Sequence, residues 1–206
     1  MLTAFQNLLA SLAISFDLPI LGWIRATVWC DALDVAMPII TMFGDAGIFW
    51  MVCAAILFLI PKTRRTGLGM AFAMMMGLLI CNVTLKPLVG RIRPYDYQIE
   101  YLGKTMQDLL VAGKLLVETP HDFSFPSGHT IASFEACAVL MLNDKRLGIP
   151  ATLLAIAIAF SRMYLYVHYP TDVIVSIVLG ILFAVIGNAI AQRIPLPTGK
   201  KGKYQR

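Results

Sequence analysis

Three short stretches of this sequence gather side chains that can take part in acid, base or nucleophilic chemistry. The last stretch contains His168 and Asp172, which are four positions apart and therefore within side-chain reach on a helix. A carboxylate bound to one imidazole nitrogen fixes the tautomer and leaves the other nitrogen free to attack. Arg162 lies a short segment earlier. An ion-paired histidine that only caps a helix would give the same pattern, so this stretch alone leaves both interpretations open.

The middle stretch runs from Phe125 to His129, at the start of an apolar segment. Proline suits the first turn of a helix, and Gly128 lets the backbone approach a ligand closely. Free amides at a helix N-terminus bind phosphate. We expect His129 to point from the first turn toward the same site. The alternative is a plain helix start with a solvated histidine.

The first stretch places Lys86 and Arg93 seven positions apart, so on one helix they would share a face two turns apart. We expect Pro94 to end that helix and Pro87 to loosen it earlier. Both cations could instead reach lipid phosphate from a helix end, as Lys and Arg often do. Arg91, between them, is a further cation whose role is open.

The composition indicates which solvent surrounds these residues. The chain has 206 residues, which suits one domain, and 58% of them are hydrophobic while 14% are charged. Soluble domains average about 25% charged residues, so a bilayer is the expected solvent. The net charge of +5 lies in short clusters between apolar runs. That pattern suits anionic lipid headgroups and does not suit a nucleic-acid partner.

Apolar segments long enough to cross a membrane occupy most of the chain after residue 42. A helix needs roughly 20 apolar residues to cross a hydrocarbon core about 30 Å thick. A fifth segment, Ser127 to Leu142, is short and polar at its start, so that end should line a wet cavity. The four longer segments are Ile48 to Ile60 (extended back toward Asp45), Thr66 to Leu88, Ile149 to Tyr166, and Pro170 to Ala191.

The first 42 residues are also apolar, but charged residues and prolines interrupt them. We expect residues 1–42 to form either a membrane-embedded hairpin, which would add a sixth span, or amphipathic helices in the interface. The predicted fold class is therefore all-α: a polytopic transmembrane bundle with five to six spans and interfacial helices.

The basic clusters predict the orientation of this bundle. They follow alternate spans, at Pro61 to Arg65, at Asn143 to Arg146, and at Gln192 through the tail 194–206. Counting spans puts all three on one face, and the positive-inside rule makes that face cytoplasmic. The loop 86–125 and the connection 161–170 then meet on the extracytoplasmic face of a cell membrane.

All three chemical stretches thus meet at one membrane face. Three basic side chains so close together would repel one another unless an anion lay among them, and Arg binds phosphate oxygens bidentately. Two histidines, with an ordinary pKa of about 6.5, can divide the roles of nucleophile and acid near neutral pH. The convergence predicts chemistry on a phosphate group.

In chain order the stretches have the form Lys-x6-Arg-Pro, Pro-Ser-Gly-His and Ser-Arg-x5-His-x3-Asp. This series resembles the type 2 phosphatidic acid phosphatase (PAP2) family at every specified position. The resemblance extends from about the first firm span to the last. It implies that residues 1–206 form a single PAP2-type membrane phosphatase domain.

The resemblance also implies a role for each motif residue. His168 would attack phosphorus and form a phosphohistidine, and Asp172 would orient it. His129 would protonate the leaving oxygen and then activate water. The phosphate would be held by Lys86, Arg93, Ser127, Gly128 and Arg162. The family needs no metal or other cofactor, and no carboxylate-rich cage is evident here.

The resemblance leaves the lipid open. We expect undecaprenyl pyrophosphate, because the chain is small and its site faces outward. Phosphatidylglycerol phosphate and phosphatidic acid are alternatives, as is a phosphotransferase that uses the same site. A non-catalytic lipid-binding protein would need cations, but not the set of His129, His168 and Asp172. No oligomeric state is predicted.

Two neighbouring features could modify the site. His121 and Asp122 precede the middle motif and could tune the site or contact the headgroup, unless they are a plain polar loop pair. The segment Gln107 to Val117 has near-helical apolar spacing. It could form a lid or interfacial helix, and a plain connecting helix fits equally well.

Overall fold

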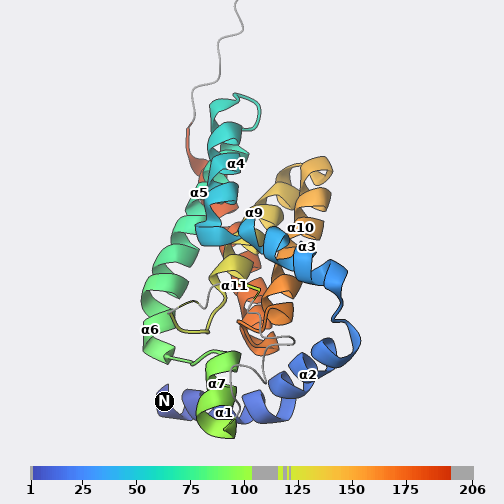
Figure 1. Ribbon diagram of the computed structural model, residues 1–206. Helices are drawn as coiled ribbons and strands as arrows, with labels where there is room; N and C mark the ends of the chain where they lie inside the picture. The colour runs from blue at the N-terminus through green and yellow to red at the C-terminus, as the bar shows by residue number, and fades with distance from the viewer. Residues whose placement is uncertain (1, 104–115, 118–119, 121, 196–206) are drawn as a thin grey trace, which may run out of the picture.

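The computed structural model describes residues 2–103, 116–117, 120 and 122–195, and the regular elements in these ranges are helical (Figure 1). The N-terminal part forms α1 (Leu2–Leu12), the π-helix η1 (Ala13–Asp17), α2 (Leu18–Thr27), α3 (Asp31–Met42), the 3-10 turn η2 (Asp45–Gly47) and α4 (Ile48–Leu59). The remainder forms α5 (Arg64–Met76), the π-helix η3 (Gly77–Leu85), α6 (Lys86–Val89), α7 (Pro94–Leu102), α9 (Gly128–Asn143), α10 (Lys145–Tyr164) and α11 (Pro170–Arg193).

Within the part of the chain that the structure describes, five helical stretches are long and apolar enough to cross a membrane, which confirms the predicted all-α membrane bundle. The short segment expected at Ser127 to Leu142 is α9, a helix of 16 residues. The five stretches are Leu2–Thr27, Asp31–Leu59, Arg64–Tyr101, Lys145–Tyr164 and Pro170–Arg193.

The first two helices lie across one end of the main bundle. In Figure 1, α1 and α2 run across one end of the bundle, at a steep angle to α5 and α11. By length and composition, however, Leu2–Thr27 qualifies as a candidate span. The choice between a spanning hairpin and interfacial helices for residues 1–42 therefore stays a prediction.

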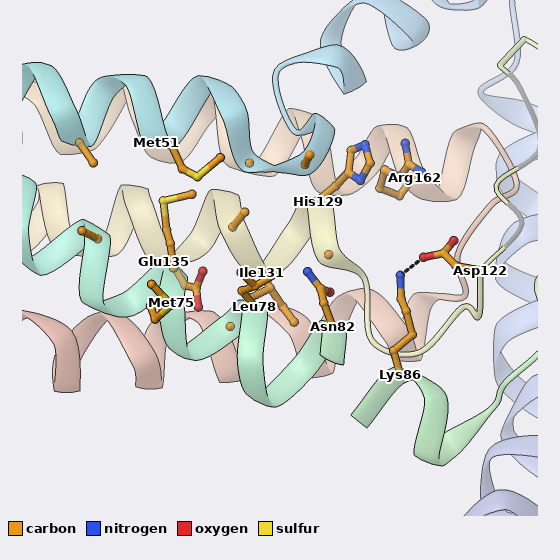
Figure 2. Close-up of a pocket in the computed structure, with 18 of the residues that line it drawn as sticks. Met51, Met75, Leu78, Asn82, Lys86, Asp122, His129, Ile131, Glu135 and Arg162 are labelled. Carbon is orange, nitrogen blue, oxygen red and sulfur yellow. Dashed lines mark hydrogen bonds and ion pairs between the residues drawn. The ribbon is translucent and has the colours of Figure 1, made fainter. Parts of the chain in front are cut away.

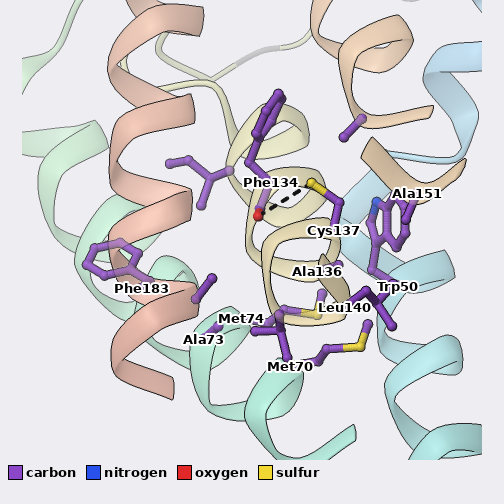
Figure 3. Packing of buried hydrophobic residues seen from close by; sticks show 14 of the residues in the cluster. Trp50, Met70, Ala73, Met74, Phe134, Ala136, Cys137, Leu140, Ala151 and Phe183 are labelled. Atoms are coloured by element: carbon purple, nitrogen blue, oxygen red, sulfur yellow. Dashed lines mark hydrogen bonds between the residues drawn. The ribbon is translucent and has the colours of Figure 1, made fainter. Parts of the chain in front are cut away.

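The core surrounds α9, which packs against α4, α5, α10 and α11 (Figure 3). Small residues allow close helix approach, as is common where helices pack in a membrane. A Cβ atom at Gly187 of α11 would lie 2.7 Å from the backbone nitrogen of Ala73 on α5. The buried core includes Trp50, Met70, Ala73, Phe134, Ala136, Cys137, Leu140, Ile158 and Phe183.

The three basic connections lie together at one end of the bundle. Arg65 donates a hydrogen bond to Gln192 at 3.3 Å, and Gln192 donates one to Asn143 at 3.2 Å. This is the arrangement expected from counting spans, because α9 returns the chain to the end where α4 finished. Which side of the membrane this end faces stays a prediction, and the tail beyond residue 195 lies outside the described residues.

The structure corrects the expectation that Lys86 and Arg93 share one helix ended by Pro94. The helix ends at Val89, where Gly90 takes a left-handed conformation with φ 61° that suits a helix C-terminus. Arg93 is extended, as the residue before a proline tends to be, and Pro94 begins α7. The chain reversal at Gly90, rather than helical periodicity, brings the two cations together.

Candidate active site

A cavity of about 910 Å³ opens between α4, α5, η3 and α9, and its polar end holds five of the basic side chains singled out by sequence (Figure 2). Each comes from a different element: α6, the extended segment before α7, the first turn of α9, the end of α10, and the connection before α11. The five residues are Lys86, Arg93, His129, Arg162 and His168.

His168 precedes α11 rather than lying on a helix with Asp172, as the four-residue spacing had suggested. Its Nδ1 lies 2.7 Å from the carbonyl oxygen of Ser124, but 3.7 Å from Oδ2 of Asp172. Because a carbonyl only accepts hydrogen bonds, Nδ1 carries the proton and the lone pair is on Nε2. Nε2 lies 3.3 Å from Nη1 of Arg93. The direct partner that sets the tautomer is therefore a backbone carbonyl that the sequence did not reveal.

The surroundings of His168 keep its imidazole neutral. Burial lowers the pKa of His168 well below its usual value, and the positive charges of Arg93 and Arg162 lower it further. A neutral imidazole retains the lone pair that attack on phosphorus requires. A bound phosphate would offset the same charges and stabilise the cation that forms on attack.

Asp172 lies behind His168, fully buried, and does not line the cavity. It pairs with Arg91 and accepts hydrogen bonds from the Ser124 hydroxyl and from the Tyr169 backbone amide. Ser124 thus joins the carboxylate to the imidazole, since its hydroxyl binds Asp172 while its carbonyl binds His168.

The role of Arg91, left open by the sequence, is to support this carboxylate. Its guanidinium pairs with Asp172 on one side and with Asp17 at 2.7 Å on the other, and lies 3.8 Å from the centre of the Tyr169 ring. Asp17 is fully buried and also accepts the Thr171 backbone amide at 2.8 Å. A buried cation with two carboxylate partners is balanced, so Arg91 is not free to bind phosphate.

His129 lies in the first turn of α9, as expected, and its Nε2 is 2.6 Å from Oδ1 of Asp45. Sequence analysis missed Asp45 as a site residue. The available signal was a carboxylate at the very start of an apolar span, where a charge usually has a functional partner. Burial and the positive charge of Arg162 lower the pKa of His129 to about 3, and the Asp45 carboxylate offsets only part of this shift. The negative charge of a bound phosphate is therefore needed to favour the protonated form that a general acid requires.

Arg162 is buried at the end of α10 and lines the cavity. Its Nη1 donates to the Thr41 hydroxyl of α3 at 2.5 Å. Its Nε has no hydrogen-bond partner among the described residues. A buried guanidinium nitrogen that is left without a partner is costly, so a phosphate oxygen is a suitable ligand for it.

Asp122 forms ion pairs with the two remaining cations of the site, Lys86 and Arg93. Its carboxylate oxygens pair with Lys86 and with Arg93, and its backbone carbonyl accepts from Nε of Arg93 at 2.9 Å. Burial alone would raise the pKa of Asp122, but the hydrogen bonds and charges of Lys86 and Arg93 lower it to about 2. The carboxylate therefore shows where an anion binds. Its neighbour His121 lies outside the described residues, as does most of the segment Gln107 to Val117.

Ser127 and Gly128 differ in their access to the site. Gly128 lines the cavity. Ser127 is buried, its hydroxyl accepts from Thr130 at 3.0 Å, and its amide donates to the Ser176 hydroxyl at 2.8 Å. Phosphate binding by Ser127 therefore stays a prediction, and the structure gives it a supporting position in the loop.

The residues that the structure describes contain no group of three or more His, Cys, Asp or Glu side chains arranged to hold a metal ion. The chemistry available to the described side chains is that of a buried neutral imidazole, a second imidazole paired with a carboxylate, and a cluster of cations. Such a set can transfer a phosphoryl group by nucleophilic and acid–base steps.

Two curated proteins illustrate what this chain is similar to. The undecaprenyl-diphosphatase of Sulfolobus acidocaldarius is 29% identical over 132 residues, which are 64% of this chain and 58% of that protein. The lipid A 4'-phosphatase of Bacteroides thetaiotaomicron is 30% identical over 76% of this chain and 72% of that protein. The chain thus spans less than two thirds of the length of the first relative.

The fold has solved counterparts. The crystal structure of Aquifex aeolicus LpxE superposes with a TM-score of 0.67 and 25% identity, covering 84% of this chain and 94% of that one. The PAP2 superfamily profile matches residues 66–195, which include all three motifs. With the profile match and the site geometry in agreement, the chain belongs to the PAP2 superfamily and is a membrane phosphatase that acts on phosphate esters of lipids.

Proposed function

We propose that this phosphatase releases phosphate through a phosphohistidine formed on His168. The observation that carries the proposal is the tautomer set by Ser124, which leaves the Nε2 lone pair at the cationic end of the cavity. Nε2 attacks phosphorus, and the bond from phosphorus to the lipid oxygen breaks. His129 gives its proton to that oxygen as it leaves.

A water molecule then completes the cycle. His129, now neutral, takes a proton from the water as the water oxygen attacks phosphorus and the phosphorus–nitrogen bond breaks. Inorganic phosphate leaves and His168 is neutral again. Arg162, Lys86 and Arg93 stabilise the charge on the equatorial oxygens in both steps, and Asp172 with Arg91 holds the loop that carries His168. Phosphate first displaces the Asp122 carboxylate from Lys86 and Arg93.

The substrate that the sequence favours is undecaprenyl pyrophosphate, with the site on the extracytoplasmic face. The similarity to the Sulfolobus undecaprenyl-diphosphatase supports this choice. The similarity to the Bacteroides lipid A 4'-phosphatase supports an acylated lipid instead. Identities near 30% do not separate these two classes, and a feature of the cavity that favours the second is described below.

The test is phosphate release by purified protein in detergent, with EDTA present throughout. Wild type should hydrolyse at least one of undecaprenyl pyrophosphate, phosphatidylglycerol phosphate and phosphatidic acid. His168→Ala should lose at least about 10³-fold in turnover, because no other described side chain offers a nucleophile at that position. An acid-labile phosphoprotein should accumulate in His129→Ala but not in His168→Ala. Substantial turnover by His168→Ala, or activity only after Mg²⁺ is added, would contradict the proposal.

A further inference from the structure

The cavity continues well beyond the phosphate-binding end. In Figure 2 it extends from His129 and Arg162, past Asn82 and Ile131, to Met51. Its lining begins at Gly47, the residue before α4, and follows that helix to Phe58, which corresponds to about 16 Å at 1.5 Å per residue. That is roughly half of a hydrocarbon core about 30 Å thick. The apolar part is therefore long enough to receive much of a lipid chain whose phosphate lies at His168.

One acidic side chain interrupts this apolar lining. Glu135 of α9 is only 1% exposed and lines the cavity, where Figure 2 shows its carboxyl group near Met75 and Ile131. Its Oε1 has no hydrogen-bond partner among the described residues. Glu135 follows His129 by six residues, or about 9 Å along the helix. A polar group therefore lies a short distance into the tail region, behind the headgroup.

The setting of Glu135 determines what it can bind. It forms no ion pair with any described residue, and a charged carboxylate is costly at this depth, so the neutral acid is the expected form. A neutral carboxylic acid has an O–H group to donate. If a hydrocarbon chain lay against Glu135, the O–H group and the second oxygen of the acid would have no hydrogen-bond partner, which is unfavourable. A carbonyl oxygen at the same place would accept the hydrogen bond.

We propose that Glu135 forms a hydrogen-bonding subsite for the ester or amide carbonyl that joins an acyl chain to a phosphorylated glycerol or sugar. Asn82 lies between Lys86 and Glu135 in Figure 2, and its amide can bind a second oxygen of the same linkage. Such carbonyls lie within a few bonds of the phosphate, whereas a polyprenyl tail has none. The proposal rests on the proposed function, and it reverses the order of substrates that the sequence favoured.

The test compares two substrates that differ only in the carbonyl. Diacylglycerol phosphate and its dialkyl ether analogue, with matched chains, are hydrolysed in the same mixed micelles, together with a polyprenyl phosphate. Wild type should show a kcat/KM for the ester about tenfold above that for the ether, which corresponds to one hydrogen bond. The difference should lie in KM, because the carbonyl does not react.

Variants then assign the preference to Glu135. Glu135→Met, which removes the donor while keeping a similar volume, should bring the ester-to-ether ratio close to one. Glu135→Gln keeps a donor and should retain most of the preference. Ile156→Met, on the outward face of α10 and away from the cavity, is the matched control and should keep the wild-type ratio. Because the ratio is taken within each variant, partial loss of folded protein cancels.

The outcomes separate this proposal from the function on which it rests. Equal hydrolysis of ester and ether by wild type, or a preference that survives Glu135→Met, would overturn the subsite while leaving a lipid phosphatase. A wild-type preference for the polyprenyl phosphate over the ester would overturn it as well. If wild type released phosphate from none of these lipids, the proposed function would fail and the subsite with it.

Discussion

At the scale of single residues, the site depends on which atoms His168 contacts. Nδ1 of His168 donates a hydrogen bond to the Ser124 carbonyl, and the hydroxyl of the same serine donates to the Asp172 carboxylate. Asp172 is thus linked to the imidazole through Ser124. This arrangement keeps a full negative charge out of direct contact with the imidazole. Burial, together with the nearby positive charges, then keeps the imidazole neutral until a phosphate binds.

This arrangement predicts the pH dependence of the free enzyme. The pKa of His168 is lowered well below 6.5, so the imidazole is neutral above that lowered pKa and becomes protonated only in more acidic solution. Activity should therefore be lost as pH falls through the lowered pKa, and the acid limb of kcat/KM should lie clearly below pH 6.5. The measurement is a pH profile of kcat/KM, corrected for the titration of the substrate phosphate followed by ³¹P NMR.

The same shift contributes to stability with a definite sign. The unfolded chain takes up a proton at His168 below about pH 6.5, whereas the folded chain does not, so stability should fall as pH decreases below that value.

An acid limb of kcat/KM centred at or above pH 6.5, after the substrate correction, would show that the buried imidazole is not the group whose neutral form is required.

At the scale of elements, helix contacts fix where the catalytic loops begin. His129 lies in the first turn of α9 and His168 in the connection that leads into α11, and α11 packs closely on α5 where Gly187 meets Ala73. The backbones approach so closely there that a side chain would have to displace α5. Gly22 on α2 has nothing within 4 Å of a Cβ atom and makes a matched comparison.

We predict opposite effects of the same substitution at these two glycines. Gly22→Ala should be neutral or stabilising by up to about 1 kcal/mol, because alanine favours the helix. Gly187→Ala should destabilise by about 1–3 kcal/mol despite that gain, because the added methyl overpacks the contact. Thermal unfolding in detergent, followed by loss of phosphatase activity, measures both. Equal stability of the two variants would mean that the α5–α11 contact can relax without cost.

At the scale of the whole molecule, segments far apart in sequence complete one site. The PAP2 superfamily profile begins at residue 66, yet Asp17, Thr41 and Asp45 from the preceding part bind Arg91, Arg162 and His129. These contacts join the N-terminal helices to the matched range at one site, and a single domain over residues 1–206 stays a prediction. They also mean that the N-terminal helices lie at the catalytic end of the bundle.

The orientation of the bundle gives a prediction at this scale. With the four native cysteines replaced by alanine, Tyr101→Cys at the catalytic end should react with a membrane-impermeant maleimide in intact cells. Lys62→Cys, in the basic connection between α4 and α5, should react only after permeabilisation, because basic connections stay in the cytoplasm. Both positions are exposed in the structure. The reverse pattern would place the active site in the cytoplasm.

The amino-acid sequence was enough to predict a membrane environment, the all-α bundle and the basic residues at the cationic end of the cavity. Long apolar runs and the three ordered motifs are local features, so they can be recognised without knowing which distant residues they contact. The prediction that one helix runs from Lys86 to Pro94 was wrong. A proline can either end a helix or begin one, and the sequence does not show that the helix already ends before the left-handed Gly90 and that Pro94 begins α7.

The groups that support the motif residues could be identified only from the folded chain. The Ser124 carbonyl, Asp45 and the Asp17–Arg91 pair carry no recognisable spacing relative to their partners, since side chains up to 84 positions apart meet there. The Ser124–His168 contact and the Asp17–Arg91 pair are buried, and burial makes an unpaired charge or donor costly. Asp45 is exposed, and the turn before α4 places it beside His129. Within the described part of the chain, Glu135 also has an unpartnered polar group, and we expect a carbonyl oxygen of the lipid to supply the missing hydrogen-bond partner.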